Sequence, residues 1–216
     1  MSSAPRQPDL LDAYSPASST SGVLHRAFDA CCAFAGLFLL SPLFCFVAIA
    51  IKLDDSGPVF YLQPRVGRNF RSFRVCKIRS MIMGADRDSL ITAPGDARLT
   101  RAGRVLRRYK IDELPQLFNV LKGDMQLVGA RPEVERYVQM FRAEYAIILQ
   151  DRPGITDPAS LAYRHEAEML DANRIERQYV EEILPAKLKL SMDYRKSRTF
   201  LSDLKVLFRT VSRTFD

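Results

Sequence analysis

The sequence predicts an α+β chain that is mostly helical and is attached to a membrane by one element near its N-terminus. Three observations predict this class: a long uncharged apolar stretch, two short segments typical of a β-hairpin, and several later segments with helical periodicity. The 216 residues are enough for one membrane-attached domain with its own core. We expect a disordered tail over residues 1–22, a membrane element over 23–53 and a folded domain over 54–216.

The membrane element is predicted from the run Ala30 to Ile51, which has 22 residues and no charged side chain. As a helix it would extend ~33 Å, enough for a hydrocarbon core of ~30 Å. Ser41-Pro42 interrupts this run. Proline costs ~3 kcal/mol in a straight helix, and the Ser41 hydroxyl can bond the carbonyl that proline leaves without a donor. These residues are compatible both with a bent helix that returns to the side it entered and with a straight span.

The hairpin is predicted from Val59–Gln63 and Phe73–Ile78, which are joined around Gly67-Arg68-Asn69. A basic helix is expected over Arg101–Tyr109. The next helix has an apolar stripe at i, i+3, i+4 and i+7 and ends at a glycine: Leu114, Leu117, Phe118, Leu121, and Gly123. We expect an extended run over 125–128, a helix containing Val134, Val138 and Phe141, a turn at 152–154, and helices over 174–182 and 186–196.

The segment 200–215 has the pattern of an amphipathic helix. Its apolar positions share one face: Phe200, Leu204, Leu207, Phe208, Val211 and Phe215. Lys205, Arg209 and Arg213 lie off that face. This layout is typical of a helix in the bilayer interface, and it is equally typical of a helix packed on a core. Attachment of the domain to a membrane favours the interface.

The charge distribution indicates phosphate-bearing partners. The net charge is +7, and the stretch from Arg65 to Lys110 has 13 basic and 3 acidic residues. Such a surface suits nucleotides, anionic lipid headgroups or nucleic acid, although a solvated basic face with no ligand has the same composition. The four cysteines show no CxxC spacing, so they indicate neither a disulfide framework nor a zinc site. Two histidines leave little material for histidine-based catalysis.

The strongest local signal for chemistry is the carboxylate pair Asp112-Glu113, followed by Leu114-Pro115. We expect Asp112 at the N-cap of a helix and Pro115 within its first turn. An Asp-Glu pair at a helix start is usually only a cap and a first-turn acid. Here it follows the densest basic stretch of the chain, where an ionised Asp could attack phosphorus. The neighbouring carboxylate could hold Mg²⁺ on a diphosphate.

Several motifs resemble those of the bacterial monotopic phosphoglycosyl transferases, also called the bacterial sugar transferase family. They are Gly57-Pro58-Val59-Phe60, Gln63-Pro64-Arg65-Val66-Gly67, Lys77-Ile78-Arg79-Ser80-Met81, the block Asp112 to Met125, Gly129-Ala130-Arg131-Pro132-Glu133, and Arg152-Pro153-Gly154-Ile155-Thr156. The resemblance extends from Val23 to Phe215, and the Asp112 block is its most specific part. It implies the small type of the family, a catalytic core without additional N-terminal membrane helices.

The resemblance implies transfer of a sugar 1-phosphate from a nucleotide diphosphate sugar, usually a UDP-sugar, to polyprenyl phosphate, with release of UMP. Asp112 matches the nucleophile that forms a covalent phospho-sugar intermediate. Glu113 matches the Mg²⁺-associated carboxylate, so we expect Mg²⁺ at this pair. Four cations in the matched motifs are expected to bind phosphate: Lys77, Arg79, Arg107 and Arg131. The reaction would initiate assembly of a surface polysaccharide or other glycoconjugate.

The resemblance also implies a re-entrant helix-break-helix at Ser41-Pro42, which dips into one leaflet of the bacterial inner membrane from the cytoplasmic face. Membrane lipid is then a partner, and self-association is left open. The sequence differs from the family's motifs in two places. Many members continue the Pro-Gly-Ile-Thr turn with Gly-Trp-Ala-Gln, whereas here Thr156 is followed by Asp157-Pro158-Ala159-Ser160-Leu161. The residue before Arg131, frequently Pro in the family, is Ala130.

Two other classes of function compete with the enzyme. A membrane-tethered nucleic-acid binder would use Phe70, Phe73 and Tyr109, which are interleaved with Arg and Lys. It explains neither the adjacent carboxylates nor the central proline, so we expect no nucleic acid partner. A scaffold without catalysis differs from the enzyme only in whether Asp112 reacts.

Overall fold

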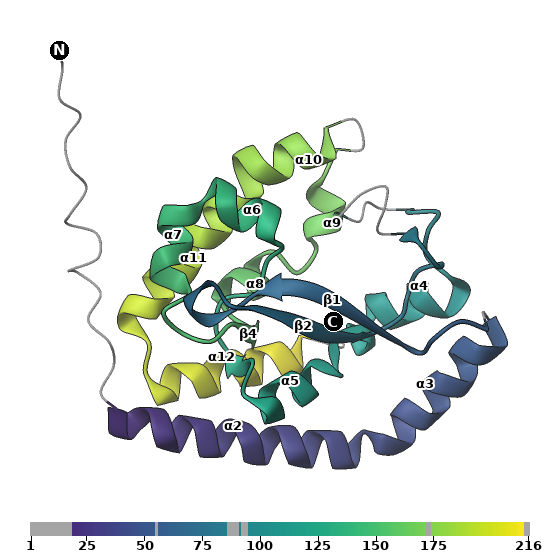
Figure 1. The fold of residues 1–216 in the computed structure, drawn as a ribbon, viewed down its shortest axis with the longest axis horizontal. Coiled ribbons are helices and arrows are strands. Elements are labelled where there is room, and N and C mark those ends of the chain that lie inside the picture. The colour runs from purple at the N-terminus through teal and green to yellow at the C-terminus, as the bar shows by residue number, and fades with distance from the viewer. Residues whose placement is uncertain (1–18, 55, 86–90, 92–94, 172–173, 214–216) are drawn as a thin grey trace.

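A computed structural model describes the chain over residues 19–54, 56–85, 91, 95–171 and 174–213 (Figure 1). Its first helix, α2, covers Ser19–Leu39 and therefore begins before the expected boundary at residue 23. The rest of the predicted tail lies outside the described residues. The described part is mostly helical, as predicted, and contains two small sheets.

The apolar run forms two helices, and the predicted break is confirmed. Leu40 separates α2 from α3 (Ser41–Asp54), and Figure 1 shows α3 rising at an angle from the end of α2. Pro42 cannot donate to the carbonyl of Phe38, and the Ser41 hydroxyl donates to that oxygen at 2.7 Å. The segment Gly22–Leu39 is long and apolar enough, by length and composition, to cross a membrane.

The hairpin is confirmed, with strands longer than predicted. Strands β1 (Phe60–Val66) and β2 (Ser72–Ile78) are antiparallel, and Phe60 is opposite Ile78. The 3₁₀ turn η1 (Arg68–Phe70) lies in the loop that joins them. This register places the C-terminal end of β2 beside the start of β1.

A second, parallel sheet was not predicted. The extended run at 125–128 is confirmed as β3 (Gln126–Val128), which pairs with β4 (Gly154–Thr156). Gly154 was expected in a turn and instead begins β4. A Cβ atom on Gly154 would lie 2.1 Å from the backbone nitrogen of Gly129, so the two chains approach as closely as they do because both residues are glycines.

The remaining helices surround these sheets (Figure 1). The basic helix is confirmed as α4 (Arg101–Arg108), and α5 (Gln116–Lys122) ends at Gly123, whose φ is 87°. The helix expected around Val134–Phe141 is divided at Phe141 into α6 and α7. The remaining helical elements are η3 (Ile111–Glu113), α6 (Glu135–Met140), α7 (Arg142–Ile148), α8 (Pro158–Ala162), α9 (Glu166–Met169), α10 (Ile175–Gln178), η4 (Tyr179–Ile183, a π-helix), α11 (Leu184–Ser197) and α12 (Phe200–Ser212).

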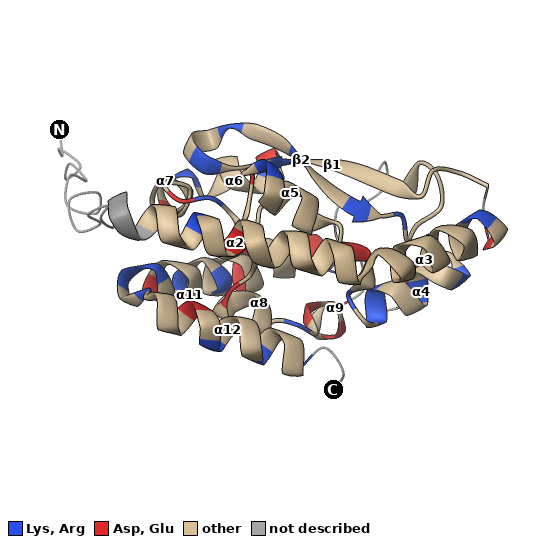
Figure 2. Cartoon of the chain, turned by 90° about the horizontal axis from the view of Figure 1, so that it is seen from below, with Lys and Arg blue, Asp and Glu red and all other residues tan. Residues whose placement is uncertain are grey.

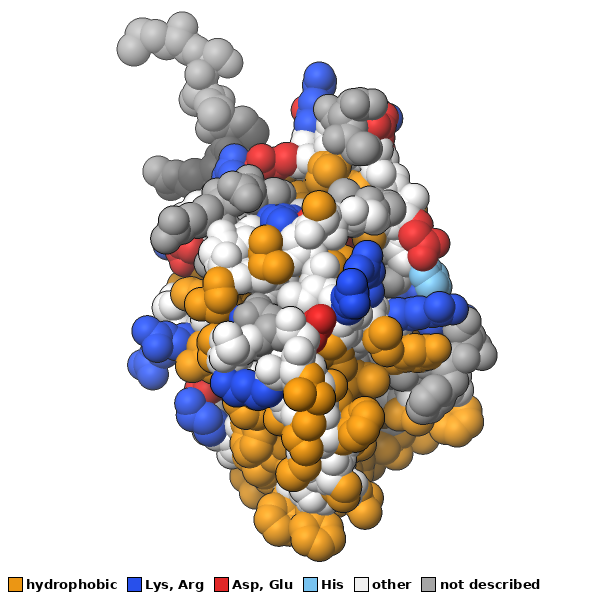
Figure 3. All heavy atoms as spheres, turned by 90° about the vertical axis from the view of Figure 1, so that its right-hand side faces the viewer, with side chains coloured by type: hydrophobic (Ala, Val, Ile, Leu, Met, Phe, Trp, Pro, Cys, Tyr) orange, Lys and Arg blue, Asp and Glu red, His pale blue; other side chains and the backbone are white. Residues whose placement is uncertain are grey.

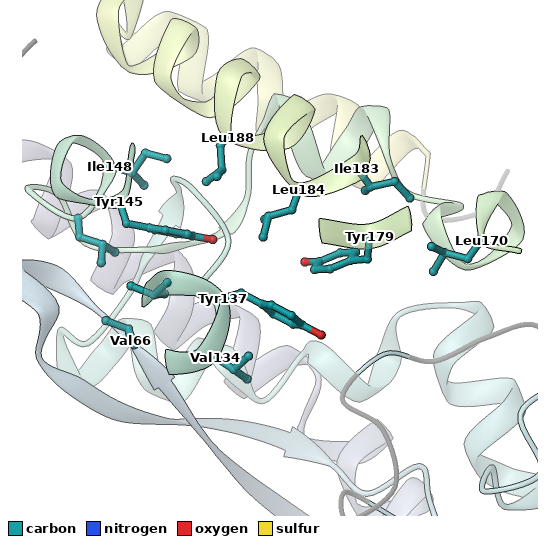
Figure 4. Close-up of a cluster of buried hydrophobic side chains, with 12 residues drawn as sticks. Val66, Val134, Tyr137, Tyr145, Ile148, Leu170, Tyr179, Ile183, Leu184 and Leu188 are labelled. Carbon is teal, nitrogen blue, oxygen red and sulfur yellow. The ribbon is translucent and has the colours of Figure 1, made fainter. Parts of the chain in front are cut away.

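Three clusters of buried side chains hold the elements together. Figure 4 shows the largest, in which three tyrosines meet two leucines of α11: Tyr137, Tyr145, Tyr179, Leu184 and Leu188. The second joins α2 to α5 and β3 through Ala33, Val120 and Val128. The third joins α3 to α4 through Val47, Ile51 and Leu106. Helices α2 and α3 are therefore packed along one side against the folded domain.

Helix α12 packs on the core, and its position in a bilayer interface stays a prediction. Val206 is buried and Leu207 packs against the second core cluster. By contrast, Leu201, Phe208 and Val211 have exposed fractions of 61%, 75% and 64%. One side of the helix thus packs on the core, and apolar side chains remain on the surface.

Candidate active site

The carboxylate pair lies in η3, a single 3₁₀ turn between α4 and α5. Lys110, just before it, has φ 56°, a left-handed conformation that reverses the chain after α4. The prediction that Asp112 caps α5 is wrong, because Pro115 occupies the N-cap position. The turn itself is closed by a backbone bond from Glu113 N to Lys110 O, so Asp112 belongs to a separate turn that precedes the helix.

The Asp112 carboxylate is buried and only partly bonded. The residue is 6% exposed, and its Oδ2 lies 3.9 Å from Nε of Arg107. Its Oδ1 accepts no hydrogen bond from the part of the chain that the structure describes. Burial, followed by the charge of Glu113, raises the pKa of Asp112 to about 6, although Lys77 and Arg107 act in the opposite direction. A pKa of about 6 makes the ionised carboxylate the main form at neutral pH, with one oxygen that is buried without a hydrogen bond from the described residues.

Glu113 is held by Arg131, from the loop after β3. The Arg131 guanidinium donates from Nη1 to Oε2 at 2.9 Å and from Nη2 to Oε1. Burial raises the pKa of Glu113, but the charges of Arg131 and Lys77 outweigh it, so this pKa lies well below its ordinary value. Arg131, which the sequence predicts as a phosphate ligand, lies at the candidate site, and two of its N–H groups donate to Glu113. A guanidinium has further N–H groups for a substrate.

Lys77 and Arg107 supply the other nearby positive charge. Lys77 lies near the end of β2, and burial lowers its pKa to about 8, with Glu113 acting in the opposite direction. Arg107, on α4, donates from Nε to the hydroxyl of Ser80 at 2.9 Å. The structure therefore brings three of the four predicted cations, Lys77, Arg107 and Arg131, together around the carboxylates.

Arg79 is arranged differently. The residue is 6% exposed, and its guanidinium packs against Gly57: a Cβ atom at that glycine would lie 2.2 Å from Nη1. Gly57 begins the first of the matched motifs, and the arginine beside it leaves no room for a side chain at this position. The expected contact of Arg79 with phosphate stays a prediction.

A second ion pair, which was not singled out from the sequence, supports the site. Arg65 pairs with Glu133, and the hydroxyl of Tyr179 donates to Oε2 of Glu133 at 2.9 Å. Burial raises the pKa of Glu133, but Arg65 outweighs it and the net shift is downward. Arg65 also lowers the pKa of Lys77. Arg65 and Glu133 both lie in matched motifs, and these motifs are the sequence feature from which the pair could have been predicted.

The described residues could supply only part of the coordination shell of a Mg²⁺ ion. Among the described residues, no group of three or more His, Cys, Asp or Glu could hold a metal. Mg²⁺ is usually held by one or two carboxylates together with substrate phosphates, and Asp112 has a buried oxygen without a hydrogen bond. Glu113 already accepts from Arg131, and its remaining lone pairs are available to a cation. The donor set thus fits Mg²⁺ shared with a diphosphate.

The segment that differs from the family's motif begins at Asp157 and lies next to the candidate site. Asp157 is the N-cap of α8: it accepts from Ser160 N at 2.7 Å, and its other oxygen accepts from the Ser191 hydroxyl at 2.6 Å. Asp157 and Ser160 line a small hollow together with Arg131 and Glu133. The altered segment therefore lies next to the arginine that holds Glu113.

Comparison with known proteins identifies the family. The family described as bacterial sugar transferase matches residues 20–216, which is most of the chain. This chain belongs to the bacterial sugar transferase family. The resemblance seen in its motifs is thus confirmed, and the carboxylate pair with its three cations lies within the matched region.

Named relatives of this bacterial sugar transferase point to one kind of reaction. A protein of Aeromonas hydrophila named UDP-N-acetylgalactosamine-undecaprenyl-phosphate N-acetylgalactosaminephosphotransferase is 38% identical over 192 residues, covering 87% of this chain and 43% of the relative. The undecaprenyl-phosphate glucose phosphotransferase of Komagataeibacter xylinus is 38% identical, covering 92% of this chain and 37% of the relative. An exopolysaccharide production protein of Sinorhizobium fredii is 30% identical, with coverage of 88% and 84%. The chain spans less than half the length of the first two relatives.

Proposed function

We propose that this bacterial sugar transferase moves a sugar 1-phosphate from a UDP-sugar to polyprenyl phosphate through a covalent intermediate on Asp112. The observation that carries the proposal is the buried Asp112 carboxylate, whose Oδ1 accepts no hydrogen bond from the described residues and which lies among three cations. The substrates are inferred from the relatives, whose names contain UDP-sugars and undecaprenyl phosphate. A relative named for exopolysaccharide production supports a role at the start of surface polysaccharide assembly.

In the first step, Oδ1 of Asp112 attacks the phosphorus that carries the sugar. A bond forms between this oxygen and phosphorus, the bond from phosphorus to the bridging oxygen of the diphosphate breaks, and UMP leaves with the electron pair. In the second step, a phosphate oxygen of polyprenyl phosphate attacks the same phosphorus. Asp112 leaves as a carboxylate, and the product is a polyprenyl diphosphate sugar.

The surrounding residues have roles that follow from their charges. Lys77 and Arg107 would neutralise the phosphoryl oxygens, and Arg131 would hold Glu113 ionised and in place. Glu113 and Asp112 would hold Mg²⁺, which when bound neutralises negative charge on the diphosphate. Arg79 is proposed as a further phosphate ligand on its matched motif alone.

The proposed location is the cytoplasmic face of the bacterial plasma membrane. We propose that α2 and α3 form a re-entrant element, because the break lies inside the apolar run and both helices pack along one side on the folded domain. In this arrangement the tail and the active site lie on the same side of the bilayer, where a nucleotide donor is available.

A release assay tests the reaction. Purified full-length protein is incubated with Mg²⁺, undecaprenyl phosphate and each member of a panel of UDP-sugars, and UMP is measured. We expect release with one or a few sugars, ping-pong kinetics, and a mass increase of one phospho-sugar on Asp112 when only the donor is present. Asp112→Asn is expected to lower turnover by several orders of magnitude, whereas the exposed control Asp193→Asn retains it. Turnover near the original rate in Asp112→Asn would overturn the assignment.

A further inference from the structure

The outward face of α4 carries three arginines that have no carboxylate partner among the described residues. Arg101, Arg104 and Arg108 are spaced at i, i+3 and i+7 and are all exposed. None forms an ion pair with any residue of the described ranges. Val105 lies among them and is 55% exposed, and Arg108 lies over the ring of Tyr109 at 5.7 Å. We call these three arginines the α4 arginine face.

Helix α4, which carries this face, packs against α3. The opposite side of α4 packs on α3 through Leu106 and Val47, and the backbone N–H of Ala102 donates to Oδ2 of Asp54 at 2.9 Å. On its own outer side α3 exposes Phe46 at 71%, Ile49 at 61% and Leu53 at 82%. Figure 3 shows apolar side chains gathered over the lower part of this end of the molecule, with Lys and Arg side chains directly above them.

We infer that the α4 arginine face binds the anionic headgroups of membrane phospholipids next to α3. The inference rests on the membrane location proposed above. With the outer side of α3 in hydrocarbon, α4 lies at the depth of the headgroups, where each Arg or Lys gains attraction to an anionic leaflet. Val105 and Tyr109 have the apolar and amphipathic side chains that suit this depth.

The acceptor phosphate is a less suitable ligand for this face. Successive residues of a helix are about 100° apart, so Arg107 leaves α4 in a direction different from that of the three arginines. Arg107 reaches Ser80 and the Asp112 carboxylate, whereas Arg101 and Arg104 are exposed and form no ion pair with the described residues. One cation of α4, Arg107, thus contacts the candidate site, whereas the three arginines of the α4 arginine face are exposed.

A single tryptophan tests the inference, because the chain has no Trp of its own. Val105→Trp is placed in the centre of the face, and the full-length protein is reconstituted into mixed vesicles of phosphatidylglycerol and phosphatidylcholine. One of the two lipids carries bromine, which quenches tryptophan fluorescence on contact. We expect brominated phosphatidylglycerol to quench at least about twice as strongly as brominated phosphatidylcholine at equal fraction, and added salt to reduce the difference.

The arginines are then removed in the same background. Arg101→Glu, Arg104→Glu and Arg108→Glu together are expected to abolish the preference for the anionic lipid. The control triple Arg136→Glu, Arg174→Glu and Arg177→Glu changes the charge equally on α6 and around α10, at the far side of the molecule from α2 in Figure 1, and is expected to retain the preference. Equal quenching by the two lipids at Val105→Trp, or the same loss in both triples, would overturn the inference.

Two further readouts separate this inference from the proposed function. Phe46→Trp reports on α3: quenching there without lipid preference at Val105→Trp retains the membrane location and rejects the lipid-binding face, whereas no quenching at either position rejects the membrane location itself. Quenching needs no turnover, so an inactive enzyme leaves the test intact. In detergent, a raised KM for polyprenyl phosphate in the α4 triple would assign the face to the acceptor and overturn the inference; an unchanged KM supports it.

Discussion

Asp112 and Lys77 have pKa values on either side of neutrality, about 6 and about 8, and burial is the first cause of both shifts. Asp112 must be ionised to attack phosphorus, so activity is lost as the pH falls through about 6. Lys77 must be protonated to neutralise phosphate, so activity is lost as the pH rises through about 8. We expect a bell-shaped profile of kcat/KM between these limits.

The donor half-reaction is the suitable measurement, because a burst of UMP without acceptor avoids the titration of polyprenyl phosphate. Lys77→Arg is expected to move only the alkaline limb upward, since a guanidinium stays protonated. An alkaline limb that stays near pH 8 in this variant would assign that limb to another group.

The pKa of Asp112 also predicts an effect on stability. Because the folded-state pKa is raised above the ordinary 3.8, the folded protein binds this proton more tightly than the unfolded chain. Stability therefore decreases as the pH rises from about 4 to about 6, and the cost of the buried charge remains in full above that range. Asp112→Asn removes this cost and is expected to raise the free energy of unfolding by about 3 kcal/mol at pH 7.5, with little change near pH 4.

Thermal unfolding of the detergent-solubilised protein at the two pH values measures this effect. The exposed Asp193→Asn serves as the control and is expected to leave the transition unchanged. A lower transition for Asp112→Asn at pH 7.5 would show that the ionised carboxylate is stabilised more by its cations than it is penalised by burial.

At the scale of elements, α2 supports the helix that follows the carboxylate pair. The guanidinium of Arg26 donates to the carbonyl oxygens of Val120 and Leu121, the latter at 2.7 Å, at the C-terminal end of α5. A Cβ atom on Gly36 would lie 3.0 Å from Cδ1 of Leu117, so the two helices are closely packed. Helix α2 therefore helps to hold α5, the helix next to the candidate active site.

Removing this cap is expected to destabilise the protein and to lower activity. Arg26→Met keeps the apolar stem and removes the charged donors, which should cost about 1.5–3 kcal/mol in unfolding free energy. Arg26→Lys restores a positive charge at the helix end and should recover part of the loss. The midpoint of thermal unfolding and the kcat of the donor half-reaction measure both effects. If Arg26→Met unfolds like the original protein, the cap does not stabilise α5.

Local signals predicted the elements, whereas contacts between distant residues were missed. The break at Pro42, the basic helix α4 and the end of α5 at Gly123 each follow from residues within one turn of the feature. The parallel pairing of β3 with β4 joins segments separated by the two helices α6 and α7, and no local pattern predicts it. For the same reason the sequence located Asp112 and Glu113 but did not show that Arg131 is bonded to Glu113.

At the scale of the whole molecule, α2 and α3 curve along one side of the folded domain (Figure 1), and the view from below shows no charged position in the middle of this arc (Figure 2). A straight span would place α3 in line with α2. Val47 and Ile51 would then lose their contacts with Leu106. The hydrogen bond from the Ser41 hydroxyl to the Phe38 carbonyl belongs to the bent arrangement. Burial of these side chains opposes such a rearrangement, so we expect the tail and the active site to lie on the same side of the membrane.

Labelling in intact cells tests this topology. A cysteine is introduced by Ser3→Cys in a background in which the four native cysteines are replaced, and a membrane-impermeant maleimide is added from outside. We expect labelling only after the cells are permeabilised. Pro42→Leu restores a backbone donor to the Phe38 carbonyl and removes the clash that favours the bend, so a larger fraction of this variant should be labelled in intact cells. Labelling of the Ser3→Cys tail from outside while Pro42 is present would show a straight span, because only a span places the tail opposite the active site.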